Sequence, residues 1–198
     1  NPIPGMIEAV PAYSSLAVFY DVRKVYELYP GNRSAFELVK IEIENILLHP
    51  VPVSTTPSQL LRIPVCYDPS CAPDMQIISE KTKLSKTEII QIHTSTTYRV
   101  YMLGFMPGFP YMGELDEKLV LPRKPNPVQV LNGSVGIAGK QTGIYPFDSP
   151  GGWHIIGRTP LKLFDASRDT PVIISAGTEI RFYSITEHEY RDNKGGNS

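Results

Sequence analysis

The chain of 198 residues is poor in the residue types that build metal sites, with two cysteines and four histidines. Cys66 and Cys71 stand in a proline-flanked stretch, and no histidine or second cysteine pair lies at zinc-ligand spacing around them. The sequence therefore predicts no metal site. Both thiols are expected to be free, as in a reducing compartment.

Charge and hydropathy give no reason to expect a nucleic acid or a membrane as a partner. The chain has 19 basic and 20 acidic residues, which leaves a net charge of −1. No apolar run reaches the roughly 18 residues that a spanning helix needs, and no signal-peptide pattern opens the chain. We therefore expect a cytoplasmic protein.

Two motifs of self-sufficient enzymes are also absent. The string GxxxxGK[ST] does not occur, which excludes binding of ATP by the P-loop route. No GxSxG elbow presents a catalytic serine. Any active site of this chain is therefore expected to be incomplete.

What the sequence does have is a segment, 133–165, that mixes glycine with side chains able to bind a ligand. It holds seven of the fifteen glycines. Glycine lets the backbone approach another backbone or a ligand closely. Two interpretations stay open, a ligand-binding surface and a set of tight β-barrel turns around an aromatic plug. The ligand-type residues between the glycines are Gln141, Thr142, Tyr145, Ser149, Trp153 and Arg158.

A second unusual string, GFMPGFPYM at 104–112, places three aromatic residues among prolines and glycines that fix and bend the backbone. A rigid aromatic loop suits stacking on a planar group or docking against a partner. The alternative is a loop whose rings fold into the core, and this alternative fits Phe105 better than Phe109 or Tyr111.

Polar candidates for chemistry are few. His93 is a candidate general base, because imidazole titrates near neutral pH, and the alternative is a hydrogen-bonded residue closing a helix. Arg123 and Arg158 are candidates for holding a carboxylate or phosphate, or are structural ion-pair partners. Gln141 and Thr142 add neutral donors and acceptors. The segment 149–153 is a candidate anion nest of backbone N–H groups, with Ser149, Gly151, Gly152 and Trp153.

The pattern predicts two domains, 1–59 and 60–190, followed by a disordered tail, 191–198. In the first domain, two β-rich runs form a hairpin, and a capping box of Ser34 with Glu37 begins a largely buried helix that ends near residue 49. In the second, a capping box of Ser85 with Glu88 begins a helix over about 86–94. Short β segments with Gly and Pro turns then indicate a closed or sandwiched β domain.

The strings 98–115, 121–130 and 133–165 carry a resemblance to a known family through GFxPGFxY and QTGIYPxxSPGGWxxIGRTP. The chain resembles the allophanate hydrolase subunit 1 family, which includes the kinase inhibitor KipI and the B-type subunit of bacterial 5-oxoprolinase. The resemblance implies an α+β fold, with a small N-terminal α/β domain before a cyclophilin-like β-barrel. Relatives usually begin with one more strand and helix, so the first domain is expected to be truncated.

The resemblance also implies a function, as one component of an ATP-dependent complex that converts 5-oxoproline to glutamate. The chain would be inactive alone, and ATP would be bound by the complex. The partners would be the A-type 5-oxoprolinase subunit and an allophanate hydrolase subunit 2-type protein, which is the C-type 5-oxoprolinase subunit. The alternatives are a KipI-like inhibitor of a histidine kinase and a component of a urea or allophanate carboxylase-type amidohydrolase.

The resemblance and the residue types together give two sets of candidate site residues. We expect His93, Gln141 and Arg158 to be catalytic. The expected substrate- or partner-binding residues are Phe109, Tyr111, Arg123, Thr142, Tyr145, Ser149, Gly151, Gly152 and Trp153.

Overall fold

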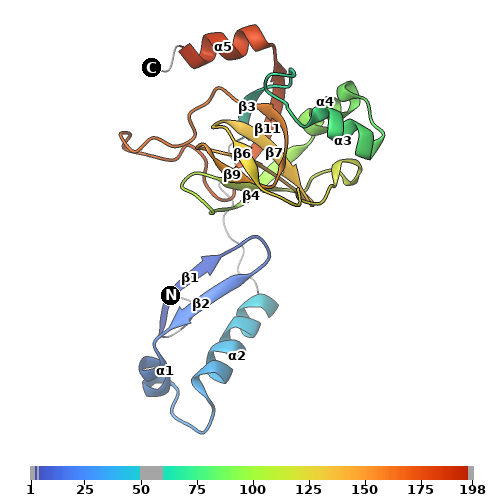
Figure 1. Cartoon of the computed structure of the whole chain (residues 1–198). Coiled ribbons are helices and arrows are strands. Elements are labelled where there is room, and N and C mark those ends of the chain that lie inside the picture. Colours follow the sequence, from blue (N-terminus) through green and yellow to red (C-terminus); the bar gives the residue numbers. More distant parts are fainter. Residues whose placement is uncertain (1–2, 4, 50–59, 196–198) are drawn as a thin grey trace. The chain divides into compact units, whose positions relative to one another are not determined.

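Two units make up this computed structural model, which describes residues 3, 5–49 and 60–195. Contacts within the chain divide it into Asn1–Pro57 and Ser58–Ser198 (Figure 1). The first unit contains a hairpin and two helices, and the second contains a closed barrel with further helices.

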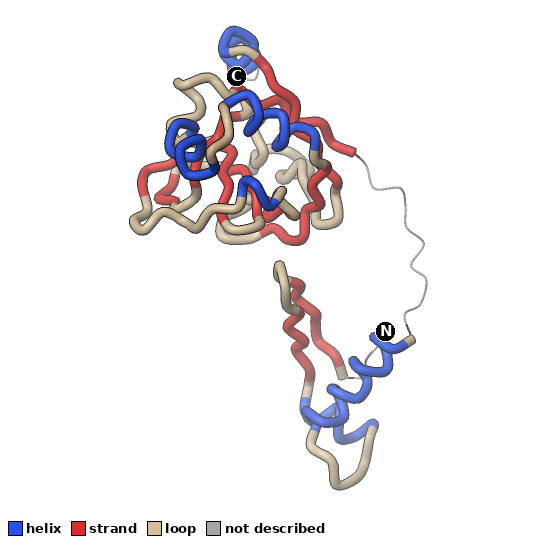
Figure 2. The backbone as a smooth tube through the Cα atoms, turned by 90° about the vertical axis from the view of Figure 1, so that its right-hand side faces the viewer, coloured by secondary structure: helices blue, strands red, loops and turns tan. Residues whose placement is uncertain are grey.

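The first unit is an antiparallel hairpin of β1 (Met6–Pro11) and β2 (Leu16–Tyr20), followed by α1 (Val22–Leu28) and α2 (Ala35–Leu48), as Figure 2 also shows. The predicted hairpin is confirmed. The predicted capping box is confirmed as well, because Ser34 accepts from the backbone N–H of Glu37 and the Glu37 carboxylate accepts from Ser34.

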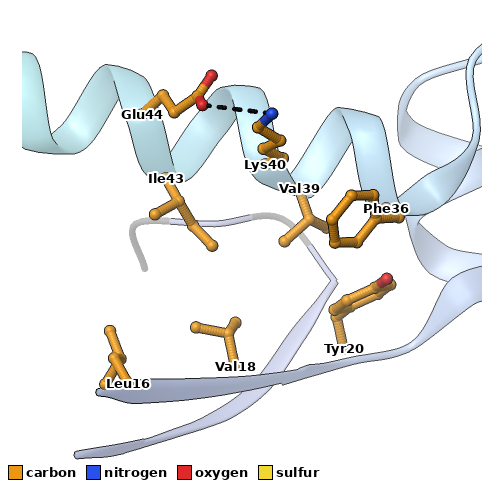
Figure 3. A pocket seen from close by; sticks show the side chains of 8 residues that line it. All are labelled: Leu16, Val18, Tyr20, Phe36, Val39, Lys40, Ile43 and Glu44. Carbon is orange, nitrogen blue, oxygen red and sulfur yellow. Dashed lines mark ion pairs between the residues drawn. The ribbon is translucent and has the colours of Figure 1, made fainter. Parts of the chain in front are cut away.

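The prediction that α2 is largely buried is wrong. Only Ala35 and Val39 are buried, whereas Phe36 is 65% exposed and Leu47 and Leu48 are each 73% exposed. Apolar residues occur around most of the helix circumference, but the two-stranded hairpin covers only one side of it. An open apolar hollow of about 340 Å³ remains between β2 and α2, where Val18 and Ile43 point toward one another (Figure 3).

The second unit is built on a closed seven-stranded barrel, in the order β10-β3-β11-β4-β5-β8-β7. This confirms the predicted β domain. The parallel pair of β3 and β11 lies within an otherwise antiparallel barrel. The barrel strands are β3 (Leu60–Cys66), β4 (Thr97–Leu103), β5 (Pro110–Gly113), β7 (Ser134–Ala138), β8 (Gln141–Ile144), β10 (His154–Arg158) and β11 (Glu179–Ile185). A separate two-stranded sheet consists of β6 (Val128–Val130) and β9 (Ser149–Gly151).

Helices α3 (Met75–Thr82) and α4 (Lys86–Ser95) and the 3-10 helix η1 (Glu117–Leu119) accompany the barrel. The predicted capping box of Ser85 with Glu88 begins α4, as expected. Helix α3 was not anticipated. Its N-cap residue, Asp74, is of a type that favours helix starts, but it makes no side-chain cap hydrogen bond. Residue 77 is Ile, so no capping box marks the start of this helix.

The expectation of a disordered tail from residue 191 is wrong as far as residue 195, because α5 runs over Glu187–Gly195. Thr186 and Glu189 form a reciprocal pair of hydrogen bonds at its start, with the Glu189 carboxylate accepting from the Thr186 N–H at 2.7 Å. Tyr190 packs in a cluster with Cys66 and Cys71. This apolar contact stabilises α5 on the barrel unit, and the polar composition of the segment gives no sign of it. Residues 196–198 lie outside the described part of the chain.

Candidate functional site

An aromatic groove of about 210 Å³ in the barrel unit brings together seven of the nine predicted binding residues. Three separate parts of the sequence meet there, which are the 104–112 string, the loop after η1 and the glycine-rich segment. The groove is lined by Phe105, Phe109, Tyr111, Arg123, Pro127, Tyr145, Pro150, Gly151, Gly152 and Trp153.

Phe109 is the centre of the aromatic wall. Its ring centroid lies 4.8 Å from that of Tyr111, 5.2 Å from that of Tyr145 and 5.5 Å from that of Trp153. Phe109 is 1% exposed and Trp153 is 4% exposed. The pairs with Tyr145 and Trp153 are edge-to-face, and such packing adds about 0.5–1.5 kcal/mol per pair beyond burial. The wall is therefore a rigid, packed surface in which Phe109 and Trp153 are core residues.

The order predicted for the two phenylalanines of the loop is reversed. Phe105, expected to be the core residue, is 63% exposed, and Phe109 is buried. The backbone of Phe105 has φ 67°, a left-handed conformation that bulky residues rarely adopt. The N–H of Phe109 donates to the Met106 carbonyl at 3.1 Å, which closes the turn. Phe105 consequently stands at the rim of the groove, edge-on to Phe109.

Two glycines make this packing possible. A Cβ at Gly151 would lie 2.5 Å from Tyr145 Oη, and one at Gly143 would lie 2.8 Å from Phe109 Cζ. Both distances are shorter than real Cβ contacts, so the rings reach their positions only beneath glycine backbone. The rings of the glycine-rich segment are therefore packed as an aromatic plug, and the same segment contributes to the groove lining. Its role as a ligand-binding surface stays a prediction.

The loop that carries Arg123 is held by a charged brace that sequence reasoning missed. Asp74 is 6% exposed, and its Oδ2 accepts from Lys124 Nζ at 2.6 Å and from the Ile155 N–H at 2.6 Å. The Lys124 N–H donates to the Gly152 carbonyl at 2.7 Å. His154 Nε2 donates to the Pro122 carbonyl at 3.1 Å, and burial lowers the pKa of His154. These contacts fix the Arg123 loop against the groove wall.

Comparisons with known proteins identify the family. A family model described as carboxyltransferase domain, subdomain C and D, matches residues 1–174. The chain belongs to this carboxyltransferase-domain family. The B-type subunit of 5-oxoprolinase from Bacillus subtilis (strain 168) is 44% identical over 192 residues, covering 96% of this chain and 80% of that protein.

Solved structures share the fold of this chain. A conserved uncharacterized protein from Pyrococcus horikoshii matches with TM-score 0.64 and 41% identity, over 93% of this chain and 81% of that one. The Kluyveromyces lactis urea carboxylase matches with TM-score 0.68 and 20% identity, over 97% of this chain and 19% of that one. At this identity, the second likeness shows the fold alone.

In this carboxyltransferase-domain protein, His93 lies in the barrel interior and does not reach the groove. It is fully buried and stacks on Phe182 at 4.5 Å between ring centroids. Thr142 donates its hydroxyl proton to the Gly136 carbonyl at 3.1 Å, so it accepts from His93 Nε2 at 3.2 Å. Nδ1 of His93 then accepts from the Tyr67 hydroxyl at 2.8 Å.

Burial lowers the pKa of His93 to about 3. The neutral imidazole satisfies the hydrogen bonds with both Tyr67 and Thr142. The geometry therefore supports the hydrogen-bonded alternative and does not support a general base that contacts substrate. Thr142, which is also fully buried, belongs to the same network and not to the groove lining.

The other predicted catalytic residues lie outside the groove lining. Gln141 begins β8 and is half-buried, and Arg158 ends β10. Within the described part of the chain, Arg158 Nε and Ser149 Oγ are buried without a hydrogen-bond partner. A catalytic role for Gln141 or Arg158 stays a prediction.

The carboxyltransferase-domain groove offers binding groups but few reactive ones. Burial raises the pKa of Tyr111, while the nearby Arg123 charge opposes this, and burial raises the pKa of Tyr145 to about 12. Both phenols are therefore neutral at physiological pH. The lining contains one cation and no carboxylate, thiol or imidazole. Such a site can hold a planar anion and stabilise charge, but it lacks a nucleophile of its own.

Metal ligands and membrane-spanning segments are both missing from the described residues. Across residues 3, 5–49 and 60–195, no group of three or more His, Cys, Asp or Glu side chains is placed to hold a metal ion. In the same part of the chain, no helix has the length and apolar character needed to cross a membrane.

Proposed function

We propose that this chain is the B-type subunit of an ATP-dependent 5-oxoprolinase, a complex that opens the lactam of 5-oxoproline to give glutamate. The observation that carries the proposal is the 44% identity to the B-type 5-oxoprolinase subunit of Bacillus subtilis over 96% of this chain. The aromatic groove supports it, because a small, nearly planar lactam carboxylate suits its size and lining.

In this proposal the groove binds and orients the substrate. The flat lactam ring lies against the side chains of Tyr111 and Trp153, and its carboxylate pairs with Arg123 at the exposed rim. The neutral phenol of Tyr111 is a donor for oxygen atoms that gain charge during ring opening. The braced loop and the packed rings hold these groups in place before substrate arrives, which lowers the cost of binding.

The rest of the chemistry belongs to partner proteins. Lactam opening is coupled to ATP hydrolysis, and this chain has no P-loop motif, so we assign ATP binding to the complex. The proposed partners are the A-type 5-oxoprolinase subunit and the C-type one, which is an allophanate hydrolase subunit 2-type protein. The isolated chain is then catalytically inactive.

Reconstitution tests the proposal. The chain should be mixed with the purified A-type and C-type partners, and glutamate formation from 5-oxoproline should be measured with and without ATP. Activity is expected only when all three proteins and ATP are present. Steady turnover by the chain alone, or none by the complete mixture, would contradict the proposal.

A variant of Arg123 tests whether the groove binds the substrate. Arg123→Ala should lower turnover by about ten-fold or more, because it removes the cation at the groove rim. Arg168→Ala is the matched control, since Arg168 is an exposed arginine of the same unit that pairs with Asp165 at 3.5 Å, outside the groove. Equal activity of the two variants would remove Arg123 from the site.

A further inference from the structure

The outer face of three neighbouring barrel strands, β3, β11 and β4, is basic. Residues alternate inward and outward along a barrel strand. On β11, Ile180 and Phe182 are buried and Arg181 is exposed. Arg62 on β3 is the direct register partner of Arg181, and Arg99 on β4 is that of Glu179. The three exposed arginines therefore share one outer face, on which Glu179 is the single carboxylate that these strands supply.

The arrangement of the arginines is unfavourable for the isolated barrel. Arg62 and Arg181 are directly opposite each other, and like charges in that position destabilise a strand pair. Among the described residues, none of the three arginines has a carboxylate oxygen within ion-pair distance. The repulsion is therefore not relieved within the part of the chain that the structure describes.

The arginine side chains are nevertheless positioned. The Arg62 guanidinium lies 5.4 Å from the ring centroid of Tyr183, and Arg181 Nε donates to the Thr94 carbonyl at 3.4 Å. Between them is an open hollow of about 470 Å³, which shares no lining residue with the aromatic groove. Leu60 is 47% exposed and Tyr183 is 38% exposed on the same face. Arginine and tyrosine beside exposed apolar groups are typical of protein interfaces.

We propose that this basic face docks a carboxylate-rich surface of one of the two partner proteins. Guanidinium groups match carboxylates through paired hydrogen bonds, and acidic groups placed between Arg62 and Arg181 would remove the repulsion. The three arginines spread over three strands, which fits a protein surface better than a single small anion. The inference rests on the proposed function for the identity of the partner.

The test measures binding of the full chain to the purified A-type and C-type partners at low and at high salt. The double variant Arg62→Glu/Arg181→Glu should bind its partner about ten-fold or more weakly than wild type, with a smaller dependence on salt. The control Lys81→Glu/Lys83→Glu makes the same change in net charge at exposed positions of α3 and its C-cap, and it should bind like wild type.

Three outcomes of the binding test would contradict the inference. Tight wild-type binding that both double variants retain would overturn the docking surface and leave the proposed function standing. Failure of wild type to bind either partner would overturn both. Binding of the wild-type chain to a second copy of itself through these arginines, seen as a dimer by light scattering, would overturn the assignment to a partner protein.

A milder variant separates docking from folding. Arg62→Gln/Arg181→Gln should also weaken binding, yet its thermal midpoint should stay level or rise by a few degrees, roughly 1–3 °C, because a repulsive pair is removed. A fall of more than about 5 °C would show that the arginines stabilise the barrel, and would overturn the argument from their repulsion.

Discussion

Breaking the ion pair of Asp74 with Lys124 should destabilise the barrel unit far more than breaking a surface ion pair. The two side chains are 9% and 15% exposed, and Asp74 Oδ2 also accepts from the Ile155 N–H at 2.6 Å. Removing one partner of a buried pair costs about 3–5 kcal/mol, and an N–H left without an acceptor costs about 1–3 kcal/mol. Because both side chains keep some contact with water and these costs overlap, we expect about 3 kcal/mol for Asp74→Ala and about 2 kcal/mol for Lys124→Met.

A double variant tests whether the charges are the cause. In Asp74→Asn/Lys124→Met, the amide oxygen of Asn still accepts from the Ile155 N–H, and methionine fills the space of the lysine stem. Neither buried charge is left alone, so this variant should lose about 1 kcal/mol or less. The exposed pair of Arg191 with Glu187, with side chains 73% and 36% exposed, is the control, and Arg191→Gln should change the free energy of unfolding by under about 0.5 kcal/mol.

The assay is urea unfolding followed by tryptophan fluorescence. Trp153 is the single tryptophan of the chain and lies in the barrel unit, so its signal reports this unit and not the hairpin unit. Single variants that each cost less than about 0.5 kcal/mol, or a double variant that loses the sum of both, would refute the brace.

Three further predictions concern the core. His93 has a pKa of about 3 in the folded chain and about 6.5 when unfolded. The free energy of unfolding should therefore fall as the pH drops below about 6.5, by at most about 1.4 kcal/mol per pH unit. His93→Gln should reduce this slope in urea titrations at several pH values. Phe109→Ala should cost about 3–5 kcal/mol and Phe105→Ala under about 1 kcal/mol, and equal losses in urea unfolding would contradict the reversed placement of the two rings. Burial raises the pKa of the Cys66 thiol to about 12, so Ellman's reagent should label it only after unfolding; rapid labelling of the native chain would show that the site opens.

Helix starts could be predicted from the sequence where the interacting residues are close in the chain. The capping boxes at Ser34 and Ser85 each need only a glutamate three residues later, and both form. Asp74 shows the limit of such reading. Its carboxylate accepts from the N–H of Ile155, 81 residues away, and does not cap α3, so no local pattern predicts the brace.

Burial was harder to predict than secondary structure. The apolar residues of α2 indicate a helix, but how many of them are covered depends on the width of the hairpin beside it. Phe105 and Phe109 have the same side chain, and the left-handed φ of Phe105 helps to set which ring faces the solvent. Sequence spacing carries no signal for that backbone angle.

Most residues that line the groove could nevertheless be predicted from the sequence, for a physical reason. Aromatic side chains placed among glycines pack beneath bare backbone, and this packing orients the groups at the surface above them. Tyr145 lies under Gly151, and the backbone of residues 151 and 152 then forms part of the groove lining. The same rings that pack together in this buried cluster therefore fix the shape of the candidate site. A site fixed in this way needs little rearrangement on binding, which suits a protein that positions a substrate for chemistry supplied by its partners.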